Sequence, residues 1–440
     1  MRERSKKDTT VRRLRTVTVV LLTLIVLVVA ALVVYAVRHP SEAPAVGQAE
    51  IVQARPTEPT RPEATEPSVT TQPEPDTTAE EETSEPTAPE EESMAQALLD
   101  SMTLEEKIYQ LFIVTPRTLT GFTGVDTAGE TTRQALERYP VGGIVYFGDN
   151  INSAGQIETM ISATQDYASY PLFICVDEEG GRVSRLSGIG VTDTLDPMAV
   201  YGAEGDVGAV RAVGRTLAGQ LASVGFNVDF APVADVVTNP NNTEIGDRSF
   251  SDEPAVAAKM VAAMVRGLQE SGTISCLKHF PGHGSTEADT HEGLSVTNRT
   301  LDELRETEFL PFAAGIKAGA EMVMISHMSA PELTGDNTPC DLSAAVVTDL
   351  LRGELGFAGV IVTDSHEMGA ITQYYGTGEA AVLAIQAGCD IVLMPYDLDE
   401  AYEAVAEAVE NGTLTEERIN ESVLRILTLK YRYGIIEENP

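Results

Sequence analysis

A short segment near the middle of the chain concentrates side chains that can carry out acid–base chemistry. Residues 278–284 read Lys-His-Phe-Pro-Gly-His-Gly, and Asp289, Thr290 and His291 follow shortly after. The segment comes directly after residues 275–277, a short apolar run typical of a β-strand. Titratable groups on a loop stiffened by one proline and loosened by two glycines indicate a reactive pocket. Such a pocket could use a bound metal or protons alone.

Short apolar runs alternate with amphipathic helical segments along the chain, and these elements must hold the loop in place. The β-type runs are residues 111–114, 143–147, 172–177, 227–232, 275–279, 322–327, 359–364 and 390–394. Strands that are apolar throughout and alternate with helices indicate a parallel sheet covered by helices. Eight such units predict a single (β/α)₈ TIM barrel over residues 94–440. A doubly wound open sheet is the alternative, but no GxGxxG motif follows the first strand.

Polar residues stand at the carboxyl ends of these runs. Asp177, His279 and Asp364 each end one of them. Apart from His39, every histidine also follows a strand end; these are His279, His283, His291, His327 and His366. Catalytic groups of TIM barrels lie at the C-terminal mouth, so this clustering predicts an enzyme with its active site there.

Two kinds of chemistry fit such a mouth. A metal hydrolase would need a His-x-His on an early strand or a His-Glu-x-x-His helix, and the sequence has neither. A retaining glycosidase needs a carboxylate below the anomeric carbon and an acid beside the leaving oxygen. Asp364 is the candidate nucleophile and His291 the candidate proton donor and acceptor, with Asp289 close enough to fix its tautomer. This second chemistry needs no metal or organic cofactor.

Five separated motifs resemble those of glycoside hydrolase family 3, in its β-N-acetylhexosaminidase branch. One is the segment of residues 278–291 described above. The others are DEEGGRVSRL at 177–186, FAPVADV at 230–236, GDRSF at 246–250 and GVIVTD at 359–364. They occur in the family's order. The resemblance implies a (β/α)₈ barrel that hydrolyses terminal β-linked N-acetylglucosamine on cell-wall muropeptides or related glycans.

The resemblance also implies a role for each matching residue. Asp364 would form a covalent glycosyl-enzyme intermediate, and His291, assisted by Asp289, would be the acid/base. The residues that would bind the sugar are Asp177, Arg185, Arg248, Lys278 and His279. Some relatives with this histidine are phosphorylases, which is the alternative within the family. A tethered, non-catalytic glycan-binding module is the alternative outside it.

Other polar residues near the motifs are predicted to support the site. His283 lies between two glycines and is predicted to shape its loop, whereas His327 and His366 are predicted to be structural. Asp235 is predicted either to brace the loop after the fourth strand or to serve the site directly. Glu178 stands where relatives commonly have glutamine, and we expect it near the pocket without contact to a catalytic group.

The N-terminal region differs from the rest of the chain. Residues 1–15 are basic, and residues 16–36 form an uninterrupted apolar stretch. As a helix this stretch would span roughly 31 Å, which predicts a transmembrane anchor with a cytoplasmic N-terminus. A cleaved signal peptide is the alternative. Residues 37–93 are rich in Pro, Thr and Glu and are predicted to be a disordered linker, which would place the catalytic domain outside the cytoplasm at the cell membrane.

Composition narrows the range of partners. The formal charge of -37 disfavours nucleic acid. The four cysteines lack the spacing of a zinc site and are predicted to be free thiols. The chain has no tryptophan, which disfavours a sugar-binding module built on exposed aromatic platforms. The resemblance implies a carbohydrate substrate that contains N-acetylglucosamine; the sequence does not fix the oligomeric state, and a monomer is favoured.

Overall fold

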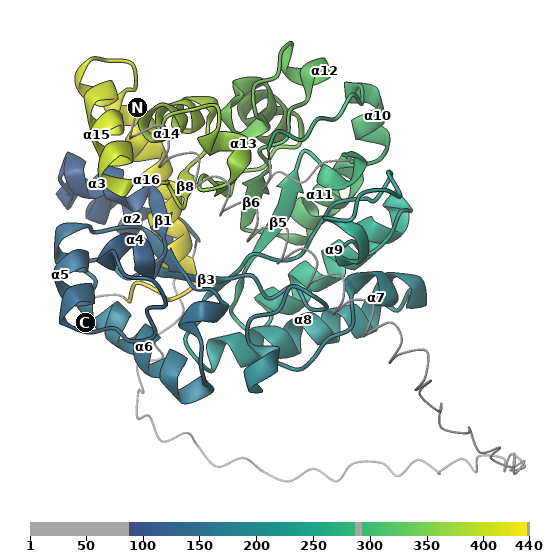
Figure 1. The fold of residues 1–440 in the computed structure, drawn as a ribbon, viewed down its shortest axis with the longest axis horizontal. Coiled ribbons are helices and arrows are strands. Elements are labelled where there is room, and N and C mark those ends of the chain that lie inside the picture. Colours follow the sequence, from purple (N-terminus) through teal and green to yellow (C-terminus); the bar gives the residue numbers. More distant parts are fainter. Residues whose placement is uncertain (1–87, 287–292, 438–440) are drawn as a thin grey trace, which may run out of the picture. The chain divides into compact units, whose positions relative to one another are not determined.

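Eight parallel strands close into a barrel in the computed structural model, which describes residues 88–286 and 293–437 (Figure 1). Each strand pairs with its neighbours in chain order, and β8 closes the ring against β1. The strands are β1 Phe112–Val114, β2 Gly143–Val145, β3 Phe173–Val176, β4 Val228–Asp229, β5 Ile274–Phe280, β6 Met322–Ile325, β7 Val360–Ser365 and β8 Ile391–Leu393. The barrel has the parallel order that the alternation of apolar runs and helices predicts.

The strands are apolar because both of their faces are covered. Every residue of β1, β3 and β8 is buried, with one face toward the barrel interior and the other toward the helices. Gly143 in β2 shows how tightly neighbouring strands approach. A Cβ atom at this position would lie 2.7 Å from the carbonyl oxygen of Phe173, so only glycine fits there.

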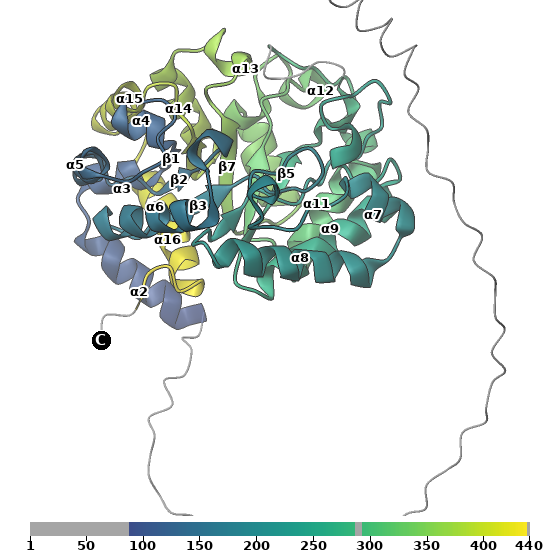
Figure 2. The same cartoon turned by 60° about the horizontal axis from the view of Figure 1, so that its bottom comes forward.

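Helices surround the barrel and complete its hydrophobic core. They are α2 Ala88–Ser101, α3 Leu104–Gln110, α4 Pro116–Thr120, α5 Glu130–Arg138, α6 Ala154–Tyr167, α7 Met198–Glu204, α8 Val207–Ala222, α9 Pro254–Gln269, α10 Leu301–Glu306, α11 Phe309–Ala318, α12 Pro331–Thr334, α13 Gly369–Thr372, α14 Thr377–Ala387, α15 Leu398–Glu410 and α16 Glu416–Arg432, together with a π-helix, Ala345–Glu354. Capping side chains fix several starts: Asp206 accepts hydrogen bonds from the first turn of α8, and Thr415 does so for α16. Helix α9 packs against α8 and α11, and α16 packs against α2 (Figure 2).

The predicted fold needs a correction at its N-terminal end. Within residues 88–286 and 293–437, no helix is long and apolar enough to cross a membrane. The predicted span, residues 16–36, lies outside the described residues, as does most of the predicted linker. Helix α2 begins at Ala88, inside the segment predicted as linker. The described residues therefore form a (β/α)₈ barrel that holds no such helix, and the location of the protein stays a prediction.

The cysteines are as predicted. Cys175, Cys276, Cys340 and Cys389 are all buried free thiols. Burial raises the pKa of each thiol, so none is ionised near neutral pH. They contribute to the core as small apolar side chains.

Candidate active site

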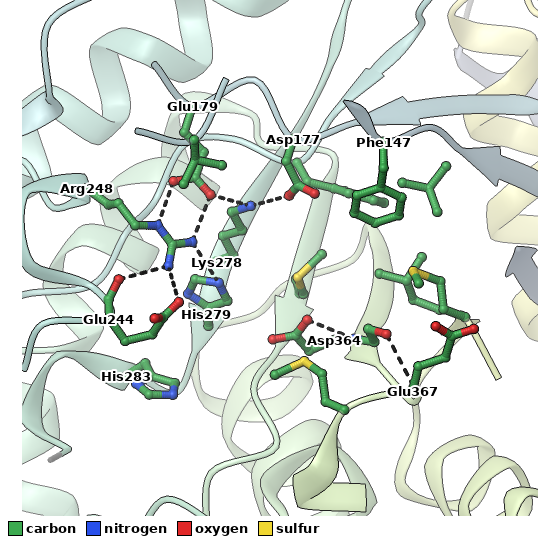
Figure 3. Close-up of a pocket in the computed structure, with 18 of the residues that line it drawn as sticks. Phe147, Asp177, Glu179, Glu244, Arg248, Lys278, His279, His283, Asp364 and Glu367 are labelled. Atoms are coloured by element: carbon green, nitrogen blue, oxygen red, sulfur yellow. Dashed lines mark hydrogen bonds and ion pairs between the residues drawn. The ribbon is translucent and has the colours of Figure 1, made fainter. Parts of the chain in front are cut away.

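A cavity of about 530 Å³ opens at the carboxyl ends of the strands (Figure 3). Its walls come from segments that are distant in sequence and that the closed barrel brings together. The predicted site residues that line it are Asp177, Arg185, Arg248, Lys278, His279 and Asp364. The mouth of the barrel thus gathers the sugar-binding candidates and the candidate nucleophile around one space.

One wall of the cavity is a network of buried ion pairs. The Nζ atom of Lys278 lies 2.6 Å from Oδ1 of Asp177 and 2.7 Å from Oε1 of Glu179. The guanidinium of Arg248 binds both oxygens of Glu179, each at 2.8 Å. It also contacts Glu244 at 3.2 Å. Such two-point contacts between arginine and carboxylate hold both groups in a fixed orientation.

The charges in this network stabilise one another. Burial by itself would raise the pKa of Glu179, but the positive charges of Lys278 and Arg248 outweigh it and hold that pKa well below its ordinary value. Burial would lower the pKa of Lys278, yet Asp177 and Glu179 raise it above the usual lysine value. Both side chains are therefore charged near neutral pH and can bind sugar hydroxyl groups through charge-assisted hydrogen bonds.

His279 is held in place by Asp235, which is fully buried. Oδ2 of Asp235 lies 2.7 Å from Nδ1 of His279 and accepts from the His279 backbone N–H at 3.2 Å, while Oδ1 accepts from the backbone N–H of His283 at 2.6 Å. Nδ1 of His279 donates its hydrogen bond to this carboxylate, which leaves Nε2 as an acceptor facing Nη2 of Arg248, at 3.5 Å. Asp235 does not line the cavity, so it braces the loop after β5 and orients His279.

Asp364 occupies the opposite wall, near the end of β7. Its Oδ1 atom accepts a hydrogen bond of 2.8 Å from the Ser365 backbone N–H, and no other hydrogen bond reaches this carboxylate from the described residues. Burial would raise the pKa of Asp364, but electrostatic interactions with the neighbouring His327 and His279 and the hydrogen bond from Ser365 lower it below the ordinary value. The carboxylate is thus ionised and lightly bonded, as a nucleophile must be.

The predicted acid/base pair, Asp289 and His291, lies outside the described residues. The chain is described up to Thr286 and again from Gly293. The roles of these two residues therefore rest on the motif in which they stand.

Comparison of the chain with known protein families gives a result that agrees with this site. A family model described as "Glycosyl hydrolase family 3 N terminal domain" matches residues 103–429. The chain belongs to glycoside hydrolase family 3.

Several members of family 3 are similar to this chain. A beta-hexosaminidase A from Pseudoalteromonas piscicida is 36% identical over 325 residues, which are 68% of this chain and 54% of that protein. A beta-hexosaminidase from Stenotrophomonas maltophilia strain K279a is 38% identical over 295 residues, 65% of this chain and 86% of that protein. The structure of a family 3 beta-N-acetylglucosaminidase from Paenibacillus sp. str. FPU-7 aligns with a TM-score of 0.72 at 37% identity, over 76% of this chain and 63% of that one. This chain thus spans about half the length of the first of these relatives.

Glu179 and Phe147 are among the residues of this site that the sequence motifs do not single out. Glu179 joins Lys278 to Arg248, and its place in the DEEGGR motif, two residues after Asp177, was the available signal. Phe147 follows β2 and lies under the Arg185 guanidinium, whose Cζ atom is 5.8 Å from the ring centroid. In the sequence Phe147 is only the last residue of an apolar run, and its contact with a cation depends on the distant position of Arg185.

Glu178 organises the loop that carries Arg185. Its Oε2 atom accepts from the backbone N–H groups of Arg185 and Leu186, at 2.6 and 3.1 Å, and its Oε1 atom accepts from the hydroxyls of Ser184 and Thr192, both at 2.6 Å. A carboxylate suits this position because both of its oxygens accept hydrogen bonds, whereas an amide offers one oxygen. Glu178 does not line the cavity, and its effect on the site is indirect.

Proposed function

We propose that this family 3 protein is a retaining β-N-acetylhexosaminidase that removes terminal β-linked N-acetylglucosamine from cell-wall-derived glycans or muropeptides. The observation that carries the proposal is the position of Asp364 across one cavity from Lys278, Asp177 and Arg248. The names of the similar family 3 proteins agree with it. The monomeric state stays a prediction.

One wall of the cavity binds the sugar, and the other carries the reacting carboxylate. Lys278 and Arg248 donate to sugar hydroxyl oxygens, while Asp177 accepts from a hydroxyl group. Their mutual ion pairs fix these groups before the substrate arrives, so binding requires little reorganisation. A sugar held against this wall presents its anomeric carbon to the carboxylate of Asp364.

The reaction proceeds in two displacements. The Asp364 carboxylate forms a bond to the anomeric carbon while the bond to the leaving oxygen breaks, and His291 gives its proton to that oxygen. His291 then takes a proton from water, which attacks the anomeric carbon and releases Asp364. Two inversions at one carbon give net retention of the β configuration.

Covalent labelling tests the proposal. The full chain is incubated with a 5-fluoro N-acetylglucosaminyl fluoride, whose glycosyl-enzyme intermediate hydrolyses slowly. We expect the protein to gain the mass of one sugar, located on Asp364 by peptide mapping, and the Asp364→Asn variant to stay unlabelled. A sugar on another carboxylate, or an α-configured first product from an ordinary β-substrate, would contradict the proposal. Adding inorganic phosphate separates the related activity, because a phosphorylase would release N-acetylglucosamine 1-phosphate.

A further inference from the structure

A second cluster of titratable side chains lies apart from the sugar cavity. His327 follows β6, Asp341 stands in a 3₁₀ turn, Cys340–Leu342, and His366 follows β7. All three residues are buried, with at most 2% of their surface exposed. One nitrogen or oxygen atom from each lies within 4.8 Å of those of the other two. None of the three lines the sugar cavity.

The spacing of these atoms suits a small metal ion. Nδ1 of His327 is 3.1 Å from Oδ1 of Asp341, and Nε2 of His366 is 3.0 Å from Oδ2 of the same carboxylate. Bonds of about 2.0–2.1 Å in a tetrahedral zinc site place ligand atoms roughly 3.3 Å apart. The two histidine–carboxylate distances are close to this value, and all three ligand atoms lie within 4.8 Å of one another, so adjustment of the side chains would bring them around one ion.

The hydrogen bonds of His327 leave its metal-binding nitrogen free. Its Nε2 atom lies 2.8 Å from the carbonyl oxygen of Ser365, and because a carbonyl only accepts, Nε2 carries the proton. Nδ1 faces Asp341 but makes no hydrogen bond of adequate geometry to any described residue, and the same holds for Oδ1 of Asp341. Metal-binding histidines commonly donate their other ring N–H to a carbonyl or carboxylate in this way, which fixes the tautomer and leaves the remaining nitrogen for an ion.

His366 gives the cluster a route to solvent. It lines a second cavity, of about 510 Å³, together with Tyr375, Tyr396 and Glu400. Its Nδ1 atom is buried and has no hydrogen-bond partner among the described residues. An ion can enter from this cavity, and water there can supply a fourth ligand.

We propose that His327, Asp341 and His366 form a structural binding site for a divalent transition metal ion of the zinc type. Two imidazoles and one carboxylate favour such an ion over Mg²⁺ or Ca²⁺, which prefer oxygen ligands. The site would tie together the segments after β6 and β7 and the turn at Asp341, and its His366 follows Asp364 by two residues in the chain. It takes no part in the hydrolytic steps.

Metal binding to the full chain tests this inference. The protein is freed of metal with a chelator and titrated with Zn²⁺ by calorimetry and with Co²⁺ by visible absorption. We expect one ion per chain, a visible spectrum of tetrahedral Co²⁺ without thiolate bands, and a higher melting temperature with Zn²⁺. The absence of thiolate bands separates this site from the nearby Cys340 and Cys389.

Variants locate the ion. His366→Gln keeps a donor to Asp341, so it should fold with a metal-free melting temperature near that of the wild type. It should nevertheless bind Zn²⁺ more weakly by at least the roughly 10- to 100-fold effect of losing a supporting hydrogen bond, and lose the thermal shift. Asp341→Asn should also weaken Zn²⁺ binding, but it should lower the metal-free melting temperature as well, because it removes a buried carboxylate that faces two histidines. His291→Ala should bind Zn²⁺ as the wild type does.

Two results would overturn the proposal. If Zn²⁺ binding survives in His366→Gln but is lost in His291→Ala, the ion is bound by His291 and not by this cluster. If the metal-free wild type binds neither Zn²⁺ nor Co²⁺, the three side chains form only an imidazole–carboxylate network.

Discussion

The two walls of the sugar cavity are built in opposite ways. On one wall, Lys278, Glu179 and Arg248 are joined by ion pairs of 2.7 to 2.8 Å and are almost completely buried. On the other wall, Asp364 receives one hydrogen bond from the described residues, and methionine side chains line the cavity beside it. The first wall is rigid and already neutralised, whereas the second keeps a carboxylate with unused bonding capacity.

This difference separates the binding of a sugar from its reaction. Charged groups that are fixed before binding stabilise a substrate without reorganisation. A carboxylate that must form a covalent bond loses nucleophilicity when strong donors occupy its lone pairs. The contrast therefore predicts that changes in the two walls have different consequences: loss of chemistry on the β7 side, and loss of both stability and affinity on the β3–β5 side.

The largest effect is expected for Asp364→Asn. The amide keeps the size of the side chain and cannot form the glycosyl intermediate, so kcat should fall by about 10⁴-fold or more, in the range seen when a nucleophile is removed. The melting temperature should change little, because the side chain accepts a single hydrogen bond from the described residues, and the amide oxygen can still accept it. Turnover of p-nitrophenyl β-N-acetylglucosaminide and a thermal melt measure both quantities. Retention of a tenth of the activity would remove Asp364 from its assigned role.

The next largest effect is expected for His291→Ala. Loss of the proton donor should slow cleavage of substrates with poor leaving groups by about 10²- to 10⁴-fold. A dinitrophenyl leaving group needs no protonation, so its release in the first step should be much less affected. Comparing a dinitrophenyl and a methylumbelliferyl glycoside measures this dependence. Equal losses for both substrates would speak against proton donation by His291.

On the ion-paired wall, Glu179→Gln should affect stability as well as affinity. It leaves the buried cations Lys278 and Arg248 without their shared carboxylate, and breaking a buried pair on one side costs about 3–5 kcal/mol. KM should rise because both donors lose their orientation. Asp247→Asn is the matched control, since Asp247 forms an exposed ion pair of 3.4 Å with Arg182 and should cost less than about 1 kcal/mol. Urea unfolding of both variants measures the difference, and equal losses would contradict the contrast between the walls.

The pH dependence of unfolding tests the charge of the ion-paired wall. The folded-state pKa of Glu179 is lowered by Lys278 and Arg248, which outweigh the opposing effect of burial. A lowered pKa contributes stability that is fully present above the unfolded value of about 4.3 and is lost as the pH falls below it. The difference in unfolding free energy between the wild type and Glu179→Gln should therefore be constant from about pH 6 to 7 and shrink below about pH 4. A difference that grows on acidification would show that Glu179 is not ionised in the folded protein.

Sequence patterns alone could predict the barrel but not the pairing of charges inside it. Apolar runs and the polar residues at their ends indicated which segments meet at the mouth, and the structure brings Asp177, Lys278 and Asp364 to one cavity. The neighbouring carboxylates Glu178 and Glu179 could not be told apart in this way. One turns to the donors of its own loop and the other to Arg248, a residue 69 positions away, and the choice depends on how the closed barrel places the distant loop.

The smallest effect is expected for Glu178→Gln, because this residue acts on the cavity only through its loop. The amide keeps one acceptor oxygen and loses the other, so some of the four donors around Glu178 lose a partner, at about 1 kcal/mol for each net hydrogen bond. Since the Arg185 guanidinium can keep its place over the Phe147 ring, kcat/KM should fall by less than about tenfold, a loss below 1.4 kcal/mol. Glu178→Ala removes both acceptors and should lower stability further without lowering kcat as Asp364→Asn does. If Glu178→Gln abolished turnover while the protein stayed folded, the loop after β3 would have to contact the reacting atoms directly, and the division between a binding wall and a reacting wall would be wrong.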